Sequence, residues 1–231
     1  MTAERPSPHV VQRFVLASGS PRRRQLLEKA GYEFDVVLPV VAEVSDAWLT
    51  IGEATACNAM RKAVAVAQNA PGAVVLGADT LVALDGHVIG KPADLASAAR
   101  LLRRLSGRSH EVWTSVFVCH PASGQAHSFQ EVSQVRFRKL NHRAIANYLA
   151  KVDPLDKAGA YAAQGHGVEI IERIEGSYSN VVGLPMEKTA RVLRAFGITS
   201  GAINLSRPLS APGPRARDAS RALARGTRTR R

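Results

Sequence analysis

Hydroxyl and cationic side chains follow the first apolar segment of the chain. Residues 18–24 read Ser-Gly-Ser-Pro-Arg-Arg-Arg, directly after the apolar run 13–17. Ser20 is a good N-cap and Pro21 a good first helical residue, so we expect a strand over 13–17 to pass into a helix that begins at residue 21. Free N–H groups and the helix dipole attract anions at such an end. The segment therefore predicts a phosphate site that includes the hydroxyls of Ser18 and Ser20.

Three arginines open the same predicted helix. Successive helical residues point about 100° apart, so the three cannot all face one phosphate. We expect Arg22 and Arg23 to face the site and Arg24 to be solvated. A capped helix with an ordinary basic surface is the alternative interpretation.

An aspartate lies in the next polar group, Gly77-Ala78-Asp79-Thr80. We expect a strand over 73–77 to end here, before a hairpin formed by 81–84 and 87–89. At a strand end Asp79 could hold a divalent cation or accept a proton from an attacking water. It could equally be a turn aspartate that bonds its own backbone. Thr80 has the same two interpretations, a substrate contact or a structural hydroxyl.

Three further charged side chains could contribute to a nucleotide site. Lys91 stands before Pro92 on a short stiff segment, and Lys62 lies on a predicted helix beside its apolar stripe. Each could contact a phosphate or simply be solvated. Glu43 could be a second metal ligand or a plain loop acid.

The segment 153–165 has Lys157 and Gln164 among small residues that would let a ligand approach closely. A glutamine amide offers a donor and an acceptor, which matches the O4 and N3–H edge of uracil or thymine. A structural glutamine at a strand end is the alternative. His110, after a helix stop at Ser106-Gly107, is interpreted as structural.

The elements that must position these residues alternate between helices and strands. Thr50 and Glu53 form a capping box, which predicts a helix to about residue 69 with Cys57, Met60, Val64 and Ala67 on its apolar side. Further helices are expected over 94–105, 141–151 and 186–196, and further strands over 34–38, 111–119, 126–138 and 168–174. This order predicts an α/β protein with a mixed sheet.

Charge and hydropathy limit the classes of protein to which the chain can belong. The 231 residues carry a net charge of +12, of which the last 31 residues, with eight arginines and one acid, contribute +7. That tail has few large apolar groups, so we expect 201–231 to be disordered and to make at most weak nucleic-acid contacts. We also expect a flexible N-terminus over 1–12 and one domain over 13–200. No apolar run is long enough to span a bilayer and no signal segment opens the chain, which predicts a cytoplasmic protein without a membrane partner.

The order of the motifs is more specific than any one of them. The chain contains, in this order, LASGSPRRRQLL, NAMRKA, VLGADTLV, GKP, LSGRSHEVWTSV, DKAGAYAAQGHG and IEGSYSNVVGLP. Together they resemble the Maf family of nucleotide pyrophosphatases over about residues 13 to 197. The resemblance implies a two-lobed Maf/ITPase-like α/β fold with an elongated mixed sheet and a central active-site cleft. It also implies a divalent cation, Mg²⁺ or Mn²⁺, and a homodimer.

The resemblance assigns roles residue by residue. Asp79 matches the family's catalytic acid, the proton acceptor for the attacking water, and with Glu43 would hold the metal. The family often has an Asp-Glu pair where this chain has Ala42 and Glu43. Three positions match those linked to substrate choice: Arg22, Thr80 and Gln164. Five match polar positions around the phosphates and metal: Ser18, Arg23, Lys62, Lys91 and Lys157.

The segment around Gln164 distinguishes two branches of the family. The branch that acts on 7-methyl-GTP tends to carry a glutamate there, whereas this chain looks like the pyrimidine branch. The resemblance therefore implies hydrolysis of dTTP and UTP, and of modified pyrimidine nucleotides as further candidates, to the monophosphate and pyrophosphate. It also suggests a link to cell division or septum formation. A nucleotide-binding or nucleic-acid-binding regulator without hydrolysis is the rival class.

Overall fold

The computed structural model describes residues 12–44 and 48–201 of the chain. The expectations of a flexible N-terminus and a disordered tail therefore fall almost entirely outside the described residues. Within these residues, no helix combines the length and the apolar character needed to cross a membrane.

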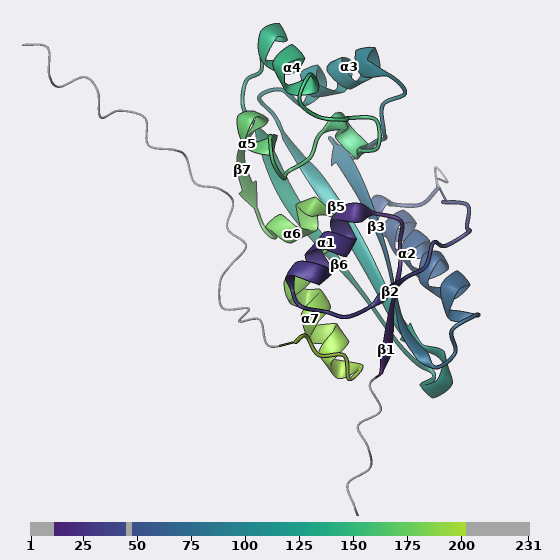
Figure 1. The fold of residues 1–231 in the computed structure, drawn as a ribbon. Coiled ribbons are helices and arrows are strands. Elements are labelled where there is room, and N and C mark those ends of the chain that lie inside the picture. Colours follow the sequence, from purple (N-terminus) through teal and green to yellow (C-terminus); the bar gives the residue numbers. More distant parts are fainter. Residues whose placement is uncertain (1–11, 45–47, 202–231) are drawn as a thin grey trace, which may run out of the picture.

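One mixed sheet runs through the molecule (Figure 1). Its order is β2-β1-β3-β5-β6-β7, with the short β4 paired to β3. β1 is parallel to β2 and β3, and the other pairs are antiparallel. This confirms the predicted α/β class with a mixed sheet. The strands are β1 (Arg13–Ala17), β2 (Asp35–Val36), β3 (Ala73–Leu84), β4 (His87–Ile89), β5 (Ser109–His120), β6 (Gln125–Phe137) and β7 (Ile171–Glu175).

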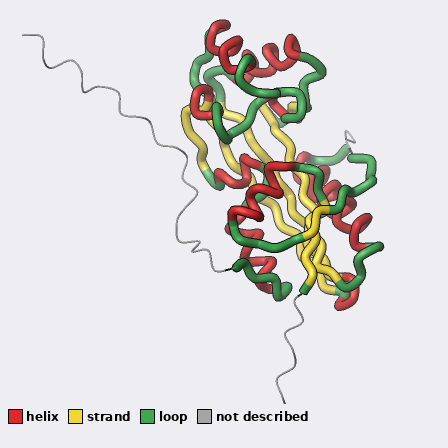
Figure 2. The backbone as a smooth tube through the Cα atoms, in the orientation of Figure 1, coloured by secondary structure: helices red, strands yellow, loops and turns green. Residues whose placement is uncertain are grey.

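The helices gather around the two ends of the long strands, which confirms the two-lobed arrangement (Figures 1 and 2). The first lobe contains α1 (Pro21–Lys29), α2 (Ile51–Ala67), α6 (Tyr178–Val182) and α7 (Met186–Ala195). The second lobe contains α3 (Leu95–Leu105), α4 (His142–Leu149), α5 (Gly167–Ile170) and the 3-10 turn η2 (Ala158–Ala160), and a second 3-10 turn, η1 (Pro121–Ser123), joins β5 to β6.

The first lobe has apolar packing on both faces of the sheet. Val15 and Val75 pack with α2 in a small cluster, whereas their neighbours Phe14 and Val74 belong to the main core. Adjacent residues of a strand point to opposite faces, so α2 covers one face and α1 with α7 covers the other. The side chains of β3 can therefore reach different helices at successive positions.

The predicted break in β3 is wrong. The strand is continuous from Ala73 to Leu84, and Asp79 pairs with Ser115 of β5 in its middle. β5 extends past this point and supplies hydrogen-bonding partners to the backbone of residues 78–80, so the chain continues as a strand instead of turning. On the other edge, β1 ends opposite Gly77 and the antiparallel β4 ends opposite Val82. Asp79 therefore lies beside a gap between two strands rather than at a strand end.

The capping box at Thr50 and Glu53 is confirmed, but the predicted apolar face of α2 is only partly right, since Ala67 is buried and Met60 and Val64 are not. Met60 and Val64 are exposed, at 43% and 39%, whereas Ala59 and Ala63 are buried. A Cβ atom at Gly77 would lie 2.3 Å from the Ala59 carbonyl oxygen, so glycine there lets α2 approach β3 closely. The side of α2 that faces β3 is therefore the one with small residues, and Met60 and Val64 lie on the exposed side.

Three smaller differences concern short elements. β2 covers Asp35–Val36 rather than 34–38. The first residues of the predicted strand 168–174 form the helical turn α5, and β7 begins only at Ile171. Gly167 permits this turn, because a Cβ atom there would lie 2.4 Å from the Ala162 carbonyl oxygen. The five-residue helix α6 had no clear apolar period and was not predicted.

Candidate active site

The loop between β1 and α1 contains the predicted phosphate-binding hydroxyls. The helix begins at Pro21 as predicted, but the Ser20 side chain makes no capping hydrogen bond. The Ser18 hydroxyl is buried and accepts from the Ser20 N–H at 3.2 Å. Arg24 is exposed and paired with Glu28 one turn along the helix, as expected for the solvated arginine. Ser18 is therefore held in place, whereas the Ser20 hydroxyl forms no capping hydrogen bond to the helix.

Arg23 is a buried cation that joins three segments of the first lobe. Its Nε donates to the Gly183 carbonyl at 2.8 Å, and its two terminal nitrogens donate to the hydroxyls of Ser18 and Thr80 at 3.1 and 3.0 Å. Burial lowers the pKa of Arg23 to about 10, and the charge of Asp79 opposes that shift. The guanidinium still carries its charge at neutral pH. It therefore supplies a fixed positive charge behind the loop that is predicted to bind phosphate.

Asp79 and Thr80 lie on opposite faces of β3. Thr80 faces α1 and α6, where its hydroxyl accepts from Arg23 and lies 3.0 Å from the Thr114 hydroxyl. Asp79 faces α2, where its Oδ1 accepts from the Lys62 Nζ at 2.6 Å. The strand thus links the β1–α1 loop, through Arg23 and Thr80, to the Asp79 carboxylate by two consecutive residues.

Lys62 bridges the two carboxylates that sequence analysis assigned to a metal. Its Nζ lies 2.6 Å from Oδ1 of Asp79 and 2.6 Å from Oε1 of Glu43. The hydrogen bond from Lys62 holds the pKa of Glu43 below its usual value against the effect of burial, with smaller contributions from Lys91 and Arg23. The carboxylates of Glu43 and Asp79 therefore converge on the positively charged ammonium group of Lys62.

A divalent cation would fit this donor set only with help from the substrate. No group of three or more His, Cys, Asp or Glu side chains is arranged for a metal within 12–44 and 48–201. Mg²⁺ is commonly held by one or two carboxylates together with substrate phosphates, so two carboxylates suffice for a cation that arrives with a nucleotide. Lys62 would then have to move away from one of them.

The second lobe presents Lys157 next to an acid that also contacts the first lobe. Lys157 Nζ donates to the Asp153 carbonyl at 2.7 Å and pairs with the Asp156 carboxylate. The other oxygen of Asp156 lies 3.2 Å from a terminal nitrogen of Arg22 on α1. Burial alone would raise the pKa of Asp156, but the hydrogen bond and charge of Lys157 outweigh it and hold the pKa below its usual value. Asp156 therefore connects the two lobes.

Lys91 and Gln164 have fewer contacts. Lys91 is exposed and close enough to lower the pKa of Glu43. Gln164 is half-buried in the bend after η2, and its side chain makes no hydrogen bond to any described residue. Both side chains are available to a ligand. His110, by contrast, lies in the core, where its Nε2 is 2.7 Å from the Tyr161 hydroxyl and burial lowers its pKa to about 4.

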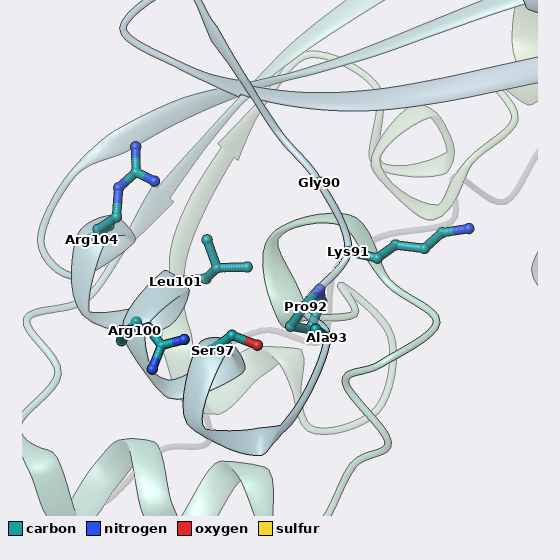
Figure 3. A pocket seen from close by; sticks show the side chains of 8 residues that line it. All are labelled: Gly90, Lys91, Pro92, Ala93, Ser97, Arg100, Leu101 and Arg104. Atoms are coloured by element: carbon teal, nitrogen blue, oxygen red, sulfur yellow. The ribbon is translucent and has the colours of Figure 1, made fainter. Parts of the chain in front are cut away.

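A cavity of about 390 Å³ lies between the 90–93 segment and α3 in the second lobe. Arg100 and Arg104 line it from the helix, and Lys91 lies at its edge with its side chain pointing away from both arginines (Figure 3). Neither Asp79 nor Glu43 lines this cavity. The convergence of charged side chains at β3, rather than this cavity, therefore marks the candidate active site.

Three contributors to the site were not predicted from the sequence. Asn58 lies next to Asp79, the Gly183 carbonyl binds Arg23, and Asp156 pairs with Arg22. Asn58 could have been found, because it stands four residues before Lys62 and shares its helical face. The other two contacts join residues more than 130 positions apart, and no local pattern predicts them.

Comparison with known proteins gives one consistent family. The Maf family model, described as "Maf-like protein", matches residues 13–196. A relative from Pelotomaculum thermopropionicum named dTTP/UTP pyrophosphatase is 44% identical over 81% of this chain and 98% of its own length. One from Bacillus anthracis with the same name is 40% identical over 81% of this chain and 97% of its own.

Solved structures are more distant. The Staphylococcus aureus Ham1 protein aligns at 16% identity over 55% of this chain and 72% of its own, with a TM-score of 0.39, a similarity too weak to add to the argument. The family match spans most of the chain, and the two relatives exceed 30% identity over nearly their whole length. The chain therefore belongs to the Maf family.

Proposed function

We propose that this protein is a nucleoside triphosphate pyrophosphatase that hydrolyses dTTP and UTP to the monophosphate and pyrophosphate. The observation that carries the proposal is the charge cluster at β3, where Lys62 Nζ lies 2.6 Å from both Asp79 and Glu43. The relatives named dTTP/UTP pyrophosphatase support this activity and this choice of substrate. Modified pyrimidine nucleotides are further candidate substrates, and a role in cell division or septum formation is a secondary proposal from the family resemblance.

In the proposed reaction, Asp79 accepts a proton from a water whose oxygen attacks the α-phosphorus. The bond from that phosphorus to the α,β-bridging oxygen breaks, and pyrophosphate leaves with the electron pair. Ser18, Arg23 and the α1 N-terminus stabilise negative charge on the phosphates, and Lys91 and Lys157 do so from the second lobe. Asp79 and Glu43 would hold Mg²⁺ or Mn²⁺, which would neutralise further phosphate charge.

Base choice is assigned to Gln164, whose side chain has no partner among the described residues. Its amide can donate to the O4 carbonyl of uracil or thymine and accept from N3–H. Arg22 and Thr80 match the other family positions linked to substrate choice. Their contacts to Asp156 and Arg23 support a role in holding the ligand-binding loops at a fixed spacing.

The test is hydrolysis of a nucleotide panel in ¹⁸O-labelled water, with Mg²⁺, with Mn²⁺ and with a chelator. Pyrophosphate release from dTTP and UTP, with the label in the monophosphate, is expected. Label in the pyrophosphate would contradict attack at the α-phosphorus. Nucleotide binding without any pyrophosphate release would favour the rival class of non-hydrolytic regulator.

A further inference from the structure

Asn58 is a buried amide that contacts Asp79 and the residue next to Glu43 in the candidate active site. It is 3% exposed and lies on the face of α2 that packs against β3. Its Oδ1 accepts from the Val44 N–H at 2.7 Å, and its Nδ2 donates to the Val44 carbonyl at 3.1 Å. The same Nδ2 lies 3.4 Å from Oδ2 of Asp79. One amide thus contacts the residue next to Glu43 and the carboxylate of Asp79.

The orientation of this amide is fixed by its partners. The Val44 N–H can only donate and the Val44 carbonyl can only accept, so Oδ1 must face the first and Nδ2 the second. A flipped amide would place its oxygen against the Val44 carbonyl and against the Asp79 carboxylate. The NH₂ group is therefore directed to Asp79 by the clamp on Val44.

Two side chains of α2, one turn apart, join the same pair of segments. Lys62 binds Glu43 and Oδ1 of Asp79, and Asn58 binds Val44 and Oδ2 of Asp79. Lys62 is charged and must move if a cation binds between the carboxylates, whereas the neutral Asn58 can stay. The link through Asn58 is therefore compatible with a cation bound between the carboxylates.

We propose that Asn58 is a positioning residue that sets the spacing between the Glu43 and Asp79 carboxylates. The inference rests on the proposed function, since it assigns to both carboxylates a part in hydrolysis. It predicts that Asn58 affects turnover more than substrate affinity, because its hydrogen bonds go to Val44 and Asp79 and none reaches the 18–20 loop or Gln164 among the described residues.

Two variants separate positioning from a merely structural role. Asn58→Ala removes all three hydrogen bonds of the amide. Because one of them reaches Asp79, kcat on dTTP should fall about 5- to 10-fold, the scale of one lost hydrogen bond, with KM changed less than about 2-fold. Asn58→Asp keeps the shape and the acceptor for Val44 N–H but places a carboxylate against Asp79, so kcat should fall further. Thr55→Ala is the matched control, a buried hydroxyl one turn earlier on α2 that bonds Ser115, and it should leave kcat within about 2-fold.

Amide hydrogen exchange over residues 37–44 tests the clamp without any catalytic readout. Asn58→Ala should speed exchange there, at Val44 above all, while Thr55→Ala should not. In a double-mutant cycle, Asn58→Ala should lower kcat by a smaller factor in a Glu43→Ala background than in the wild type. Wild-type turnover from folded Asn58→Ala and Asn58→Asp proteins, or unchanged exchange over 37–44, would overturn the inference. Absence of pyrophosphate release by the wild type would instead refute the proposed function. The hydrogen-exchange data would still show whether Asn58 holds the segment at Val44 in place.

Discussion

Four first-lobe side chains of the site are buried or nearly so and are bonded within the first lobe, whereas the second-lobe side chains that complete the site are exposed or half-buried. We call Ser18, Arg23, Lys62 and Asp79 the buried half of the site, and Lys91, Lys157 and Gln164 the open half. Each member of the buried half has at least one hydrogen bond to another member or to Thr80. In the open half, Lys157 is the only side chain with hydrogen-bonding partners among the described residues. Its partners, the Asp153 carbonyl and the Asp156 carboxylate, lie in the same loop.

This difference separates two tasks of a hydrolase. Fixed charges stabilise a transition state without reorganising during the reaction, and burial strengthens their effect. Exposed side chains can adapt to a ligand and contribute mainly to binding. The buried half should therefore govern turnover and stability, and the open half should govern affinity and base choice.

The largest expected effect is that of Asp79→Asn. The amide keeps the size of the side chain but cannot accept the water proton, so kcat on dTTP should fall by at least about 100-fold. Steady-state pyrophosphate release measures it, with circular dichroism to establish folding. Substantial turnover by a folded variant would remove Asp79 from the mechanism.

Gln164→Glu tests base choice in the open half. A carboxylate opposite O4 of the base would leave two acceptors facing each other, at a cost of about 1 to 3 kcal/mol, or roughly 5- to 150-fold in kcat/KM. The loss should appear for dTTP and UTP, while activity on guanine nucleotides should stay level or rise. CTP belongs in the panel because a rotated glutamine would suit cytosine. Equal losses on every base would mean that Gln164 positions phosphate or backbone instead.

Much of the fold followed from local patterns, whereas the partners within the site did not. The capping box at Thr50 and Glu53 predicted the start of α2, because its two hydrogen bonds are local. The continuity of β3 through Asp79 depends on pairing with β5, more than 30 residues away. The buried face of α2 depends on the close approach at Gly77, which no helical period reveals.

The candidate residues were predictable as types, and the structure supplied their connections. Asp79, Glu43 and Lys62 come together as one cluster, and Ser18, Arg23 and Thr80 as another. Arg23 was expected to face a phosphate, but three of its donors bind protein, one of them to the Gly183 carbonyl that α6 brings to α1 late in the chain. The homodimer, the metal and the role of the tail stay predictions.

Arg23→Lys tests whether the buried half also stabilises the fold. Lysine keeps the charge but cannot donate in three fixed directions, so some of the partners of Arg23 lose their bonds. Unfolding free energy in urea should fall by about 1 to 3 kcal/mol. Arg24→Lys is the adjacent control, since Arg24 is exposed and bonded only to Glu28, and its change should stay below about 0.5 kcal/mol. Equal stability of the two variants would contradict the distinction between the halves.

The smallest expected effect is that of Lys91→Gln in the open half. Lys91 is exposed and bonded to no described residue, so its loss should leave the unfolding free energy unchanged. An exposed ion pair with a substrate phosphate is worth about 0.2 to 1 kcal/mol, so KM for dTTP should rise by up to about 5-fold. Because that contact would be made equally in the ground and transition states, kcat should change little. The increase should shrink at high salt, which screens exposed charges, and Lys29→Gln at the far end of α1 should have no such effect. A fall in kcat larger than the rise in KM would place Lys91 with the buried half, as a group that acts on the transition state.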